Sequence, residues 1–183
     1  QSMEDVGSLE NIQHGLVREA LRLTGIESGV EITTIADIPG QGTGLGSSSS
    51  VTVGLLNAMH AFQGREASKD QLAEEACQIE IDTLGAPIGR QDQYAASFGG
   101  VNSIRFGENG VQVEPIEVSE GLSKKFSENF TLVFTGMTRS ASKVLSEQSD
   151  DESDKNSRMR EIRKHADEAV SFIQQGDLNS LGS

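Results

Sequence analysis

The chain has 183 residues, which is enough to bury a hydrophobic core, and we expect one domain or one and a part. Its 28 acidic and 15 basic residues give a net charge of −13, which argues against a nucleic-acid backbone as a partner. No apolar run approaches the roughly 20 residues of a membrane span, and the single cysteine, Cys77, excludes an internal disulfide. These totals predict a cytoplasmic protein with no membrane partner.

The N-terminal part of the chain predicts a helix followed by a strand. Apolar residues recur at helical spacing from Ser8 to Thr24, and Gly25 is expected to end this helix. The β-branched segment from Val30 to Ile38 then predicts a strand.

A glycine- and serine-rich stretch follows this strand. Glycine occupies every second position from Gly40 to Gly46, and four serines follow from Ser47 to Ser50. The apolar run after them predicts a central helix that Gly64 ends. The first turn of a helix offers N–H groups without intrahelical partners, at the positive end of the helix dipole. We therefore favour a phosphate-binding site here, although a loop of this composition can also be only a connection.

The next helix, expected from Ser68 to Leu84, carries a carboxylate on its apolar face. Glu80 falls in the middle of the apolar arc, where an isolated carboxylate is costly to bury unless a cation, a metal or donor groups face it. A structural ion pair or an exposed gap in the packing would account for this position. We favour Glu80 as a Mg²⁺ ligand that faces the phosphate loop.

A polar cluster follows the break in this helix. Taken alone, Asp92 is typical of a helix N-cap or a turn. However, it comes twelve residues after Glu80, just past the break. We therefore expect both carboxylates to converge on one pocket.

The part that follows predicts a hairpin, a boundary and a strand. Apolar residues alternate in 101–106 and 111–113 around a glycine-bearing turn, and Pro115 is expected to end the second arm. Residues 121–129 are polar and predict a boundary, whereas residues 130–134 (FTLVF) predict a buried strand. Arg139 comes soon after this strand, as either a phosphate ligand or an ordinary surface charge.

The C-terminal segments are predominantly helical in pattern. Residues 140–148 predict a short helix, and residues 149–154 predict a solvated acidic loop. A long helix is expected from about Lys155 to Gly176, with His165 solvated beside its apolar stripe, and another helix starts near Leu181.

Together these residues resemble the GHMP kinases, the superfamily of galactokinase, homoserine kinase and mevalonate kinase. The segment PGQGTGLGSSS (39–49) looks like the central phosphate-binding motif of the superfamily. Glu80 followed by GRQDQ (89–93) is similar to its second carboxylate pair. Two segments, GRQDQYAASFGGVNSI (89–104) and FTGMTRSASKVLSEQ (134–148), look most like the sequences of D-glycero-D-manno-heptose 7-phosphate kinases.

The resemblance implies an α+β fold of two domains. Residues 1–129 would form the ribosomal-S5-like N-terminal domain, without its first strands, and residues 130–183 would begin a ferredoxin-like C-terminal domain. GHMP kinases are considerably longer than this chain, so we expect both domains to be incomplete and the chain to be a central fragment.

The resemblance also implies roles for particular residues. Asp92 would orient or deprotonate the sugar hydroxyl, the Ser48 hydroxyl and Glu80 would hold Mg²⁺, and Arg90 or Arg139 would bind the phosphate of the substrate. ATP would be bound by the phosphate loop, at Gly42, Gly44, Leu45, Gly46, Ser47, Ser48 and Ser49.

The implied function is ATP-dependent phosphorylation of the anomeric hydroxyl of a heptose 7-phosphate. Another sugar-1-kinase of the superfamily, such as an L-fucose kinase, is the nearest enzymatic alternative. A nucleotide-binding module without turnover is the alternative from another class, and a homodimer is left open.

Overall fold

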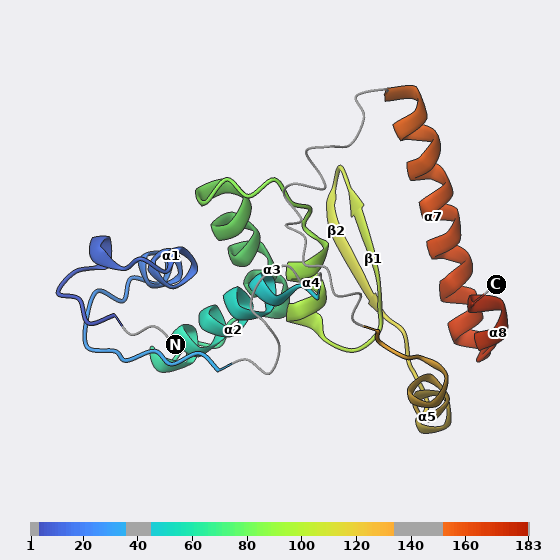
Figure 1. The fold of residues 1–183 in the computed structure, drawn as a ribbon, viewed down its shortest axis with the longest axis horizontal. Coiled ribbons are helices and arrows are strands. Elements are labelled where there is room, and N and C mark those ends of the chain that lie inside the picture. The colour runs from blue at the N-terminus through green and yellow to red at the C-terminus, as the bar shows by residue number, and fades with distance from the viewer. Residues whose placement is uncertain (1–3, 36–44, 134–151, 183) are drawn as a thin grey trace. The chain divides into compact units, whose positions relative to one another are not determined.

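The computed structural model describes residues 4–35, 45–133 and 152–182 (Figure 1). The described residues divide into two compact units, one up to Phe98 and the other from Gly99 onward. The first unit contains five helical segments and a short 3-10 turn: η1 (Leu9–Asn11), α1 (Gly15–Thr24), α2 (Ser47–Phe62), α3 (Lys69–Cys77), η2 (Gln78–Thr83) and α4 (Gln91–Phe98).

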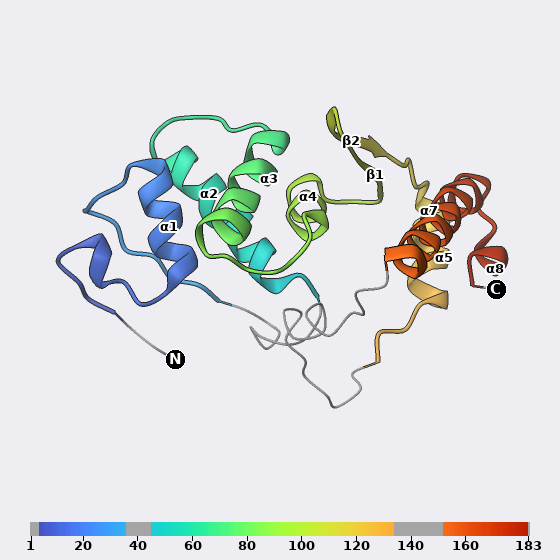
Figure 2. The same ribbon diagram turned by 90° about the horizontal axis from the view of Figure 1, so that it is seen from above.

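Helix α2 is the centre of the first unit. It contacts α1, α3 and α4, and Figure 2 shows it between α1 on one side and α3 with α4 on the other. Its apolar residues lie on several faces, so it can be buried by more than one neighbour at once. The expected central helix from Ser47 is therefore confirmed, with Gly64 just beyond its end at a φ of 70°.

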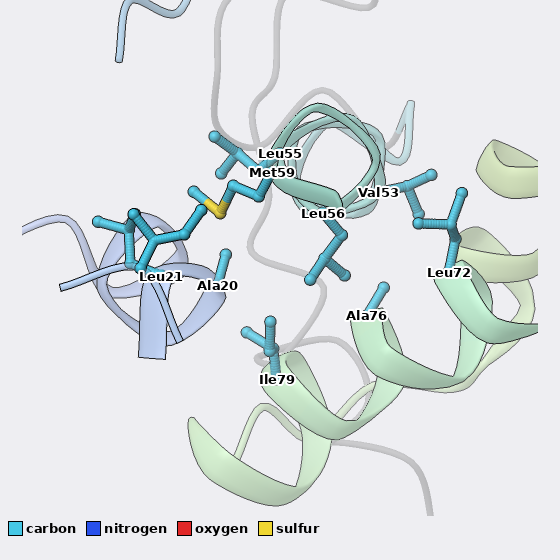
Figure 3. Close-up of a cluster of buried hydrophobic side chains, with 10 residues drawn as sticks. Ala20, Leu21, Val53, Leu55, Leu56, Met59, Leu72, Ala76 and Ile79 are labelled. Carbon is cyan, nitrogen blue, oxygen red and sulfur yellow. The ribbon is translucent and has the colours of Figure 1, made fainter. Parts of the chain in front are cut away.

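The hydrophobic core lies where three helical segments meet α2. Figure 3 shows Leu56 pointing between α3 and η2, while Leu55 and Met59 face α1. Leu56 is fully buried, so truncating it to alanine should cost about 2–5 kcal/mol. The core cluster comprises Ala20, Leu21, Ile26, Val53, Leu55, Leu56, Met59, Leu72, Ala76 and Ile79.

The first predicted helix begins later than the sequence pattern indicated. Residues 9–11 form only the turn η1, which no Ser8 side-chain hydrogen bond caps, and α1 starts at Gly15 behind His14. The His14 ring accepts a hydrogen bond from the Val17 N–H and so caps α1. Gly25 ends α1 in the left-handed region, as expected.

The predicted strand from Val30 to Ile38 does not form in its described part. Residues 30–35 form no strand, and residues 36–38 lie outside the described part. A strand requires ladder hydrogen bonds to a neighbour, and the sheet in the described residues contains only two later strands. Ile35 is accordingly 90% exposed.

The second unit begins with the predicted hairpin. Strands β1 (Asn102–Gly107) and β2 (Gly110–Pro115) pair antiparallel, with Gly107 opposite Gly110 at the turn. Gly110 has a φ of 110°, which residues with a Cβ rarely adopt, so the turn requires glycine there. Pro115 ends the second arm, as predicted.

Helices follow the hairpin. The polar segment predicted as a boundary instead forms α5 (Glu120–Asn129). The Ser119 side chain caps this helix, and one of its own residues, Leu122, is buried. The predicted buried strand after it is exposed in its described residues, with Leu132 80% exposed. Helices α7 (Glu152–Gln175) and α8 (Leu178–Leu181) complete the unit, and Gly176 separates them as predicted.

Other predictions for this unit have mixed outcomes. His165 is exposed, as expected, and lies 3.4 Å from a Glu168 carboxylate oxygen. The apolar stripe of α7 is only partly covered, since Ile162 is 62% exposed. The helix predicted at 140–148 lies outside the described residues. None of the described helices is long and apolar enough to cross a membrane.

A buried carboxylate on α1 gives a prediction for stability. Glu19 accepts hydrogen bonds from Arg22 and, at 3.0 Å, from Arg18, and Arg22 also reaches Glu10 at 2.9 Å. The Arg22 hydrogen bond is the largest cause that lowers the pKa of Glu19 below its ordinary value, while burial opposes it. Because the folded pKa is the lower one, this stabilisation is present above the unfolded pKa and is lost as the pH falls through the folded pKa.

We therefore expect Glu19→Gln to cost about 2 kcal/mol at pH 7, with a smaller difference from wild type below about pH 4. Urea unfolding at both pH values measures this, and Glu10→Gln, at an exposed end of the same network, should cost less. A Glu19→Gln difference that stays constant into acid would contradict the assignment.

Candidate active site

The N-terminus of α2 differs from those of α3 and α5 in its capping. Its N-cap residue, Gly46, has a φ of 65° and no side chain, so no side-chain hydrogen bond caps the helix. Helices α3 and α5, in contrast, are capped by Ser68 and Ser119 and carry an acidic residue in the first turn. The first turn of α2 contains no acidic residue. Its N–H groups and the positive end of its dipole therefore favour a negatively charged ligand.

Glu80 is buried against this first turn. It lies in the π-helical segment η2, which continues α3, and is 3% exposed. Its Oε2 accepts a hydrogen bond from the Ser49 hydroxyl at 3.3 Å, whereas its Oε1 has no hydrogen-bond partner among the described residues. A π segment changes the direction of the side chains relative to an α-helix and is frequent at functional sites. The sequence pattern placed Glu80 correctly on the buried arc but contained no sign of the π geometry.

Asp92 reaches the same turn from another helix. It lies in the first turn of α4 and its side chain packs against Gly46. A Cβ atom at Gly46 would lie 3.5 Å from the Asp92 Cγ and 3.6 Å from its Oδ2. These are ordinary van der Waals distances, so the positive φ of Gly46, and not a lack of space, is what favours glycine beside this carboxyl group.

The structure therefore brings the two predicted carboxylates to one place. Glu80 contacts Ser49 and Asp92 contacts Gly46, three residues apart around the first turn of α2. The serines differ in orientation: the Ser49 hydroxyl is buried and faces inward, whereas Ser48 is exposed. A phosphate could therefore reach the main chain of Ser49 but not its hydroxyl. At Ser48 the hydroxyl is exposed and could be reached as well.

Arg90 lies in a different environment. Its guanidinium pairs with Glu74 and lies 5.8 Å from the centre of the Tyr94 ring. The Tyr94 hydroxyl donates to the same Glu74 carboxylate, and burial is the largest cause that raises the pKa of Tyr94. These contacts tie the start of α4 to α3, so they do not favour Arg90 as a phosphate ligand, and that role stays a prediction.

Three other predicted site residues cannot be placed. Gly42, Gly44 and Arg139 lie outside the described residues. Leu45 is 45% exposed and leads into the first turn of α2. It also lines an open groove of about 1400 Å³ together with Ser47, Ser48 and parts of α1 and α2, but neither Glu80 nor Asp92 lines this groove.

The chemistry of Glu80 fits a magnesium ligand. An unpartnered, buried carboxylate oxygen is costly, and a cation would compensate it. No group of three or more His, Cys, Asp or Glu side chains that could hold a metal occurs in the described parts of the chain. Mg²⁺ does not require such a group, because it is usually held by one or two carboxylates, waters and the phosphates of the substrate.

Gln93 is a site residue that the sequence reasoning missed. It is completely buried beside Asp92, in a segment where the pattern indicated only a polar cluster. With its amide oriented to satisfy its neighbours, its oxygen accepts from the Ser49 hydroxyl at 3.2 Å. The sequence contains no periodic signal that would have indicated this burial.

Comparison with known proteins now identifies the part of the chain that carries this site. Residues 11–100 match the family described as GHMP kinases N terminal domain, and this range contains α1 to α4 with both carboxylates. This segment belongs to the GHMP kinases. The expected family and the α+β class are thus confirmed. The predicted domain boundary at residue 129 stays a prediction.

Curated relatives that resemble this chain are sugar kinases and a mevalonate kinase. It is 36% identical over 112 residues to a D-glycero-alpha-D-manno-heptose 7-phosphate kinase of Campylobacter jejuni, covering 61% of this chain and 33% of that protein. It is 30% identical over 141 residues to an L-fucokinase/L-fucose-1-P guanylyltransferase of Bacteroides fragilis, covering 74% of this chain and 14% of that protein.

Solved structures show the same fold. A D-glycero-D-manno-heptose 1-phosphate kinase from Bacteroides thetaiotaomicron superposes with a TM-score of 0.79 at 25% identity, covering 99% of this chain and 56% of that one. A putative sugar kinase from Campylobacter jejuni gives a TM-score of 0.71 at 26% identity, with 98% and 51% coverage. The chain thus spans about half the length of these structures and about a third of the heptose 7-phosphate kinase.

Proposed function

We propose that this GHMP kinase chain carries the phosphoryl-transfer site of an ATP-dependent sugar kinase, which phosphorylates the anomeric hydroxyl of a heptose 7-phosphate. The observation that carries the proposal is the meeting of Glu80 and Asp92 at the uncapped first turn of α2. The expected cytoplasmic location and a homodimer remain predictions.

The main chain at the start of α2 would bind the ATP phosphates. The main-chain N–H groups of this first turn lie at the positive end of the helix dipole, which favours the negatively charged phosphates. These donors are fixed by the fold before ATP binds, so no reorganisation is needed as charge builds up on the transferred phosphoryl group. The groove beside Leu45, Ser47 and Ser48 offers room for the rest of a nucleotide.

Asp92 would act on the sugar hydroxyl. Its carboxylate lies next to Gly46, close to where the phosphate chain of ATP would end. From there it can accept the proton of the attacking hydroxyl and hold the oxygen in line with the phosphoryl group. Glu80, together with the exposed Ser48 hydroxyl, would hold Mg²⁺, which neutralises charge on the phosphates when bound.

Support for a heptose phosphate as substrate comes from the relatives. Both the curated heptose 7-phosphate kinase and the solved heptose 1-phosphate kinase are named for such sugars. An L-fucose kinase is the second candidate, because the Bacteroides fragilis relative is similar over a longer part of this chain.

Incubation with Mg·ATP and D-glycero-D-manno-heptose 7-phosphate tests the proposal. We expect a heptose bisphosphate, detected by mass spectrometry, and a new anomeric phosphate signal in ³¹P NMR. Transfer to L-fucose alone would favour the second candidate. ATP binding without transfer to either sugar would mean that the chain is a nucleotide-binding module, and absence of any nucleotide-induced shift in Tm would contradict both.

Gly46 provides an independent prediction at this site. Gly46→Ala and Gly64→Ala both place a Cβ on a residue with φ near 70°, at opposite ends of α2, and each should cost about 1–2 kcal/mol. Only Gly46→Ala places its methyl group at the start of α2 and in contact with Asp92, whereas a Cβ at Gly64 meets no other atom within 4 Å. We therefore expect only this variant to weaken ATP binding in calorimetry. Equal losses of ATP affinity in both variants would show that the effect is merely strain in α2.

A further inference from the structure

Gln93 connects the segment that leads into α4 with the first turn of α2. Its side chain is fully buried although it follows the exposed Asp92 directly in α4. Its amide nitrogen lies 3.3 Å from the Gly89 carbonyl oxygen and 3.2 Å from the Arg90 carbonyl oxygen. These two hydrogen bonds fix the segment that leads into α4 and therefore the start of the helix that carries Asp92.

The other end of the same amide reaches α2. The Gln93 oxygen lies 3.2 Å from the Ser49 hydroxyl, which is itself 3.3 Å from Glu80 Oε2. A serine hydroxyl has a single hydrogen to donate, and here it faces two acceptors. The three buried side chains therefore form one connected group, and a change in any of them alters the orientation of the others.

We propose that Gln93 is a positioning residue for phosphoryl transfer. This proposal rests on the proposed kinase function. Its amide holds Asp92 and Glu80 in one rigid frame around the first turn of α2. It does this through Ser49 on one side and the Gly89 and Arg90 carbonyls on the other. Gln93 touches neither the nucleotide nor the sugar in this arrangement. It sets the direction of the groups that do, as outer partners of catalytic and metal-binding groups commonly do.

The variant Gln93→Met tests this role, because methionine keeps the length of the side chain and removes both hydrogen-bonding ends. The matched control is Gln91→Met, which changes the exposed glutamine on the other side of Asp92. We expect Gln93→Met to lower kcat for phosphoryl transfer about 10–100-fold, with the KM for ATP changed less than about threefold since the main-chain donors of α2 remain. Gln91→Met should keep the wild-type kcat.

Ser49→Ala provides a second route if Gln93→Met does not fold. It removes the shared hydroxyl and introduces a residue with high helix propensity. Its kcat should also fall, and the double variant should lose less than the product of the two single losses, because both disturb one connection. Folded variants with wild-type kcat, or independent effects in the double variant, would overturn the proposal.

Unfolding measurements separate this inference from the proposed function. A double-mutant cycle between Gln93 and Ser49 in urea should show a coupling free energy whether or not the chain transfers phosphate. Zero coupling contradicts the positioning role. Absence of transfer by a wild-type chain with intact coupling contradicts the kinase function instead.

Discussion

Replacing Asp92 by asparagine is expected to lower phosphoryl transfer about 10²–10⁴-fold, the range typical of losing a general base, while ATP binding is retained. The amide has nearly the same shape, so it still fits beside Gly46, but it cannot accept the proton of the sugar hydroxyl. Turnover assays with Mg·ATP and heptose 7-phosphate measure the first effect, and calorimetry with Mg·ATP measures the second.

Asp70→Asn is the matched control for this variant. Asp70 also lies in the first turn of a helix, α3, and is exposed. Both substitutions remove the same small stabilisation of a helix dipole, so any difference in turnover comes from the site. Wild-type turnover in Asp92→Asn would remove Asp92 from the reaction. A loss of ATP affinity equal to the loss of turnover would indicate a binding role rather than proton transfer.

The sequence was most informative where a pattern depends on local residues and their neighbours in the chain. Helix α2 is apolar on several faces, and this pattern alone predicts a central position for it. The hairpin followed from alternation around a glycine turn, and β1 and β2 pair antiparallel as a hairpin requires. The place of Glu80 on the buried arc also followed from helical spacing alone.

The sequence was less informative where the structure depends on partners distant in the chain. Residues 30–35 have strand-like composition but form no strand, because no ladder partner faces them in the described residues. Leu132 and Val133 are apolar and yet exposed for the same kind of reason, since no element within the described parts of the chain covers them. Conversely, the polar segment of α5 becomes helical through one cap at Ser119 and one buried leucine.

The same division applies to the candidate site. The types and spacing of Glu80 and Asp92 predicted that they would converge, and the geometry now places both at the first turn of α2. The connection through Gln93 could not be predicted, because a single buried amide has no periodic signal. Arg90 pairs with Glu74 of α3, sixteen residues earlier in the chain, and the sequence pattern gave no indication of this ion pair.

Replacing Glu80 by glutamine should separate metal binding from stability. In the metal-free chain Glu80 is a buried carboxylate with one hydrogen bond, at 3.3 Å, and one unpartnered oxygen. A neutral amide is less costly to bury than a charge, so the metal-free variant should unfold at the same temperature as wild type or a higher one. With Mg·ATP the order should reverse, because a charge-assisted contact worth about 1.5–3 kcal/mol is lost.

We therefore expect the Mg²⁺ concentration needed for half-maximal ATP binding to rise about tenfold or more in Glu80→Gln, since each 1.4 kcal/mol is worth about a factor of ten. Asp82→Asn, two residues further along η2 and exposed, should keep the wild-type metal dependence. Titration of Mg²⁺ at fixed ATP, followed by thermal shift, measures both. An unchanged metal dependence in Glu80→Gln would contradict the role of Glu80 as a Mg²⁺ ligand. The Glu80 carboxylate would then serve only to hold Ser49 and the first turn of α2 in place.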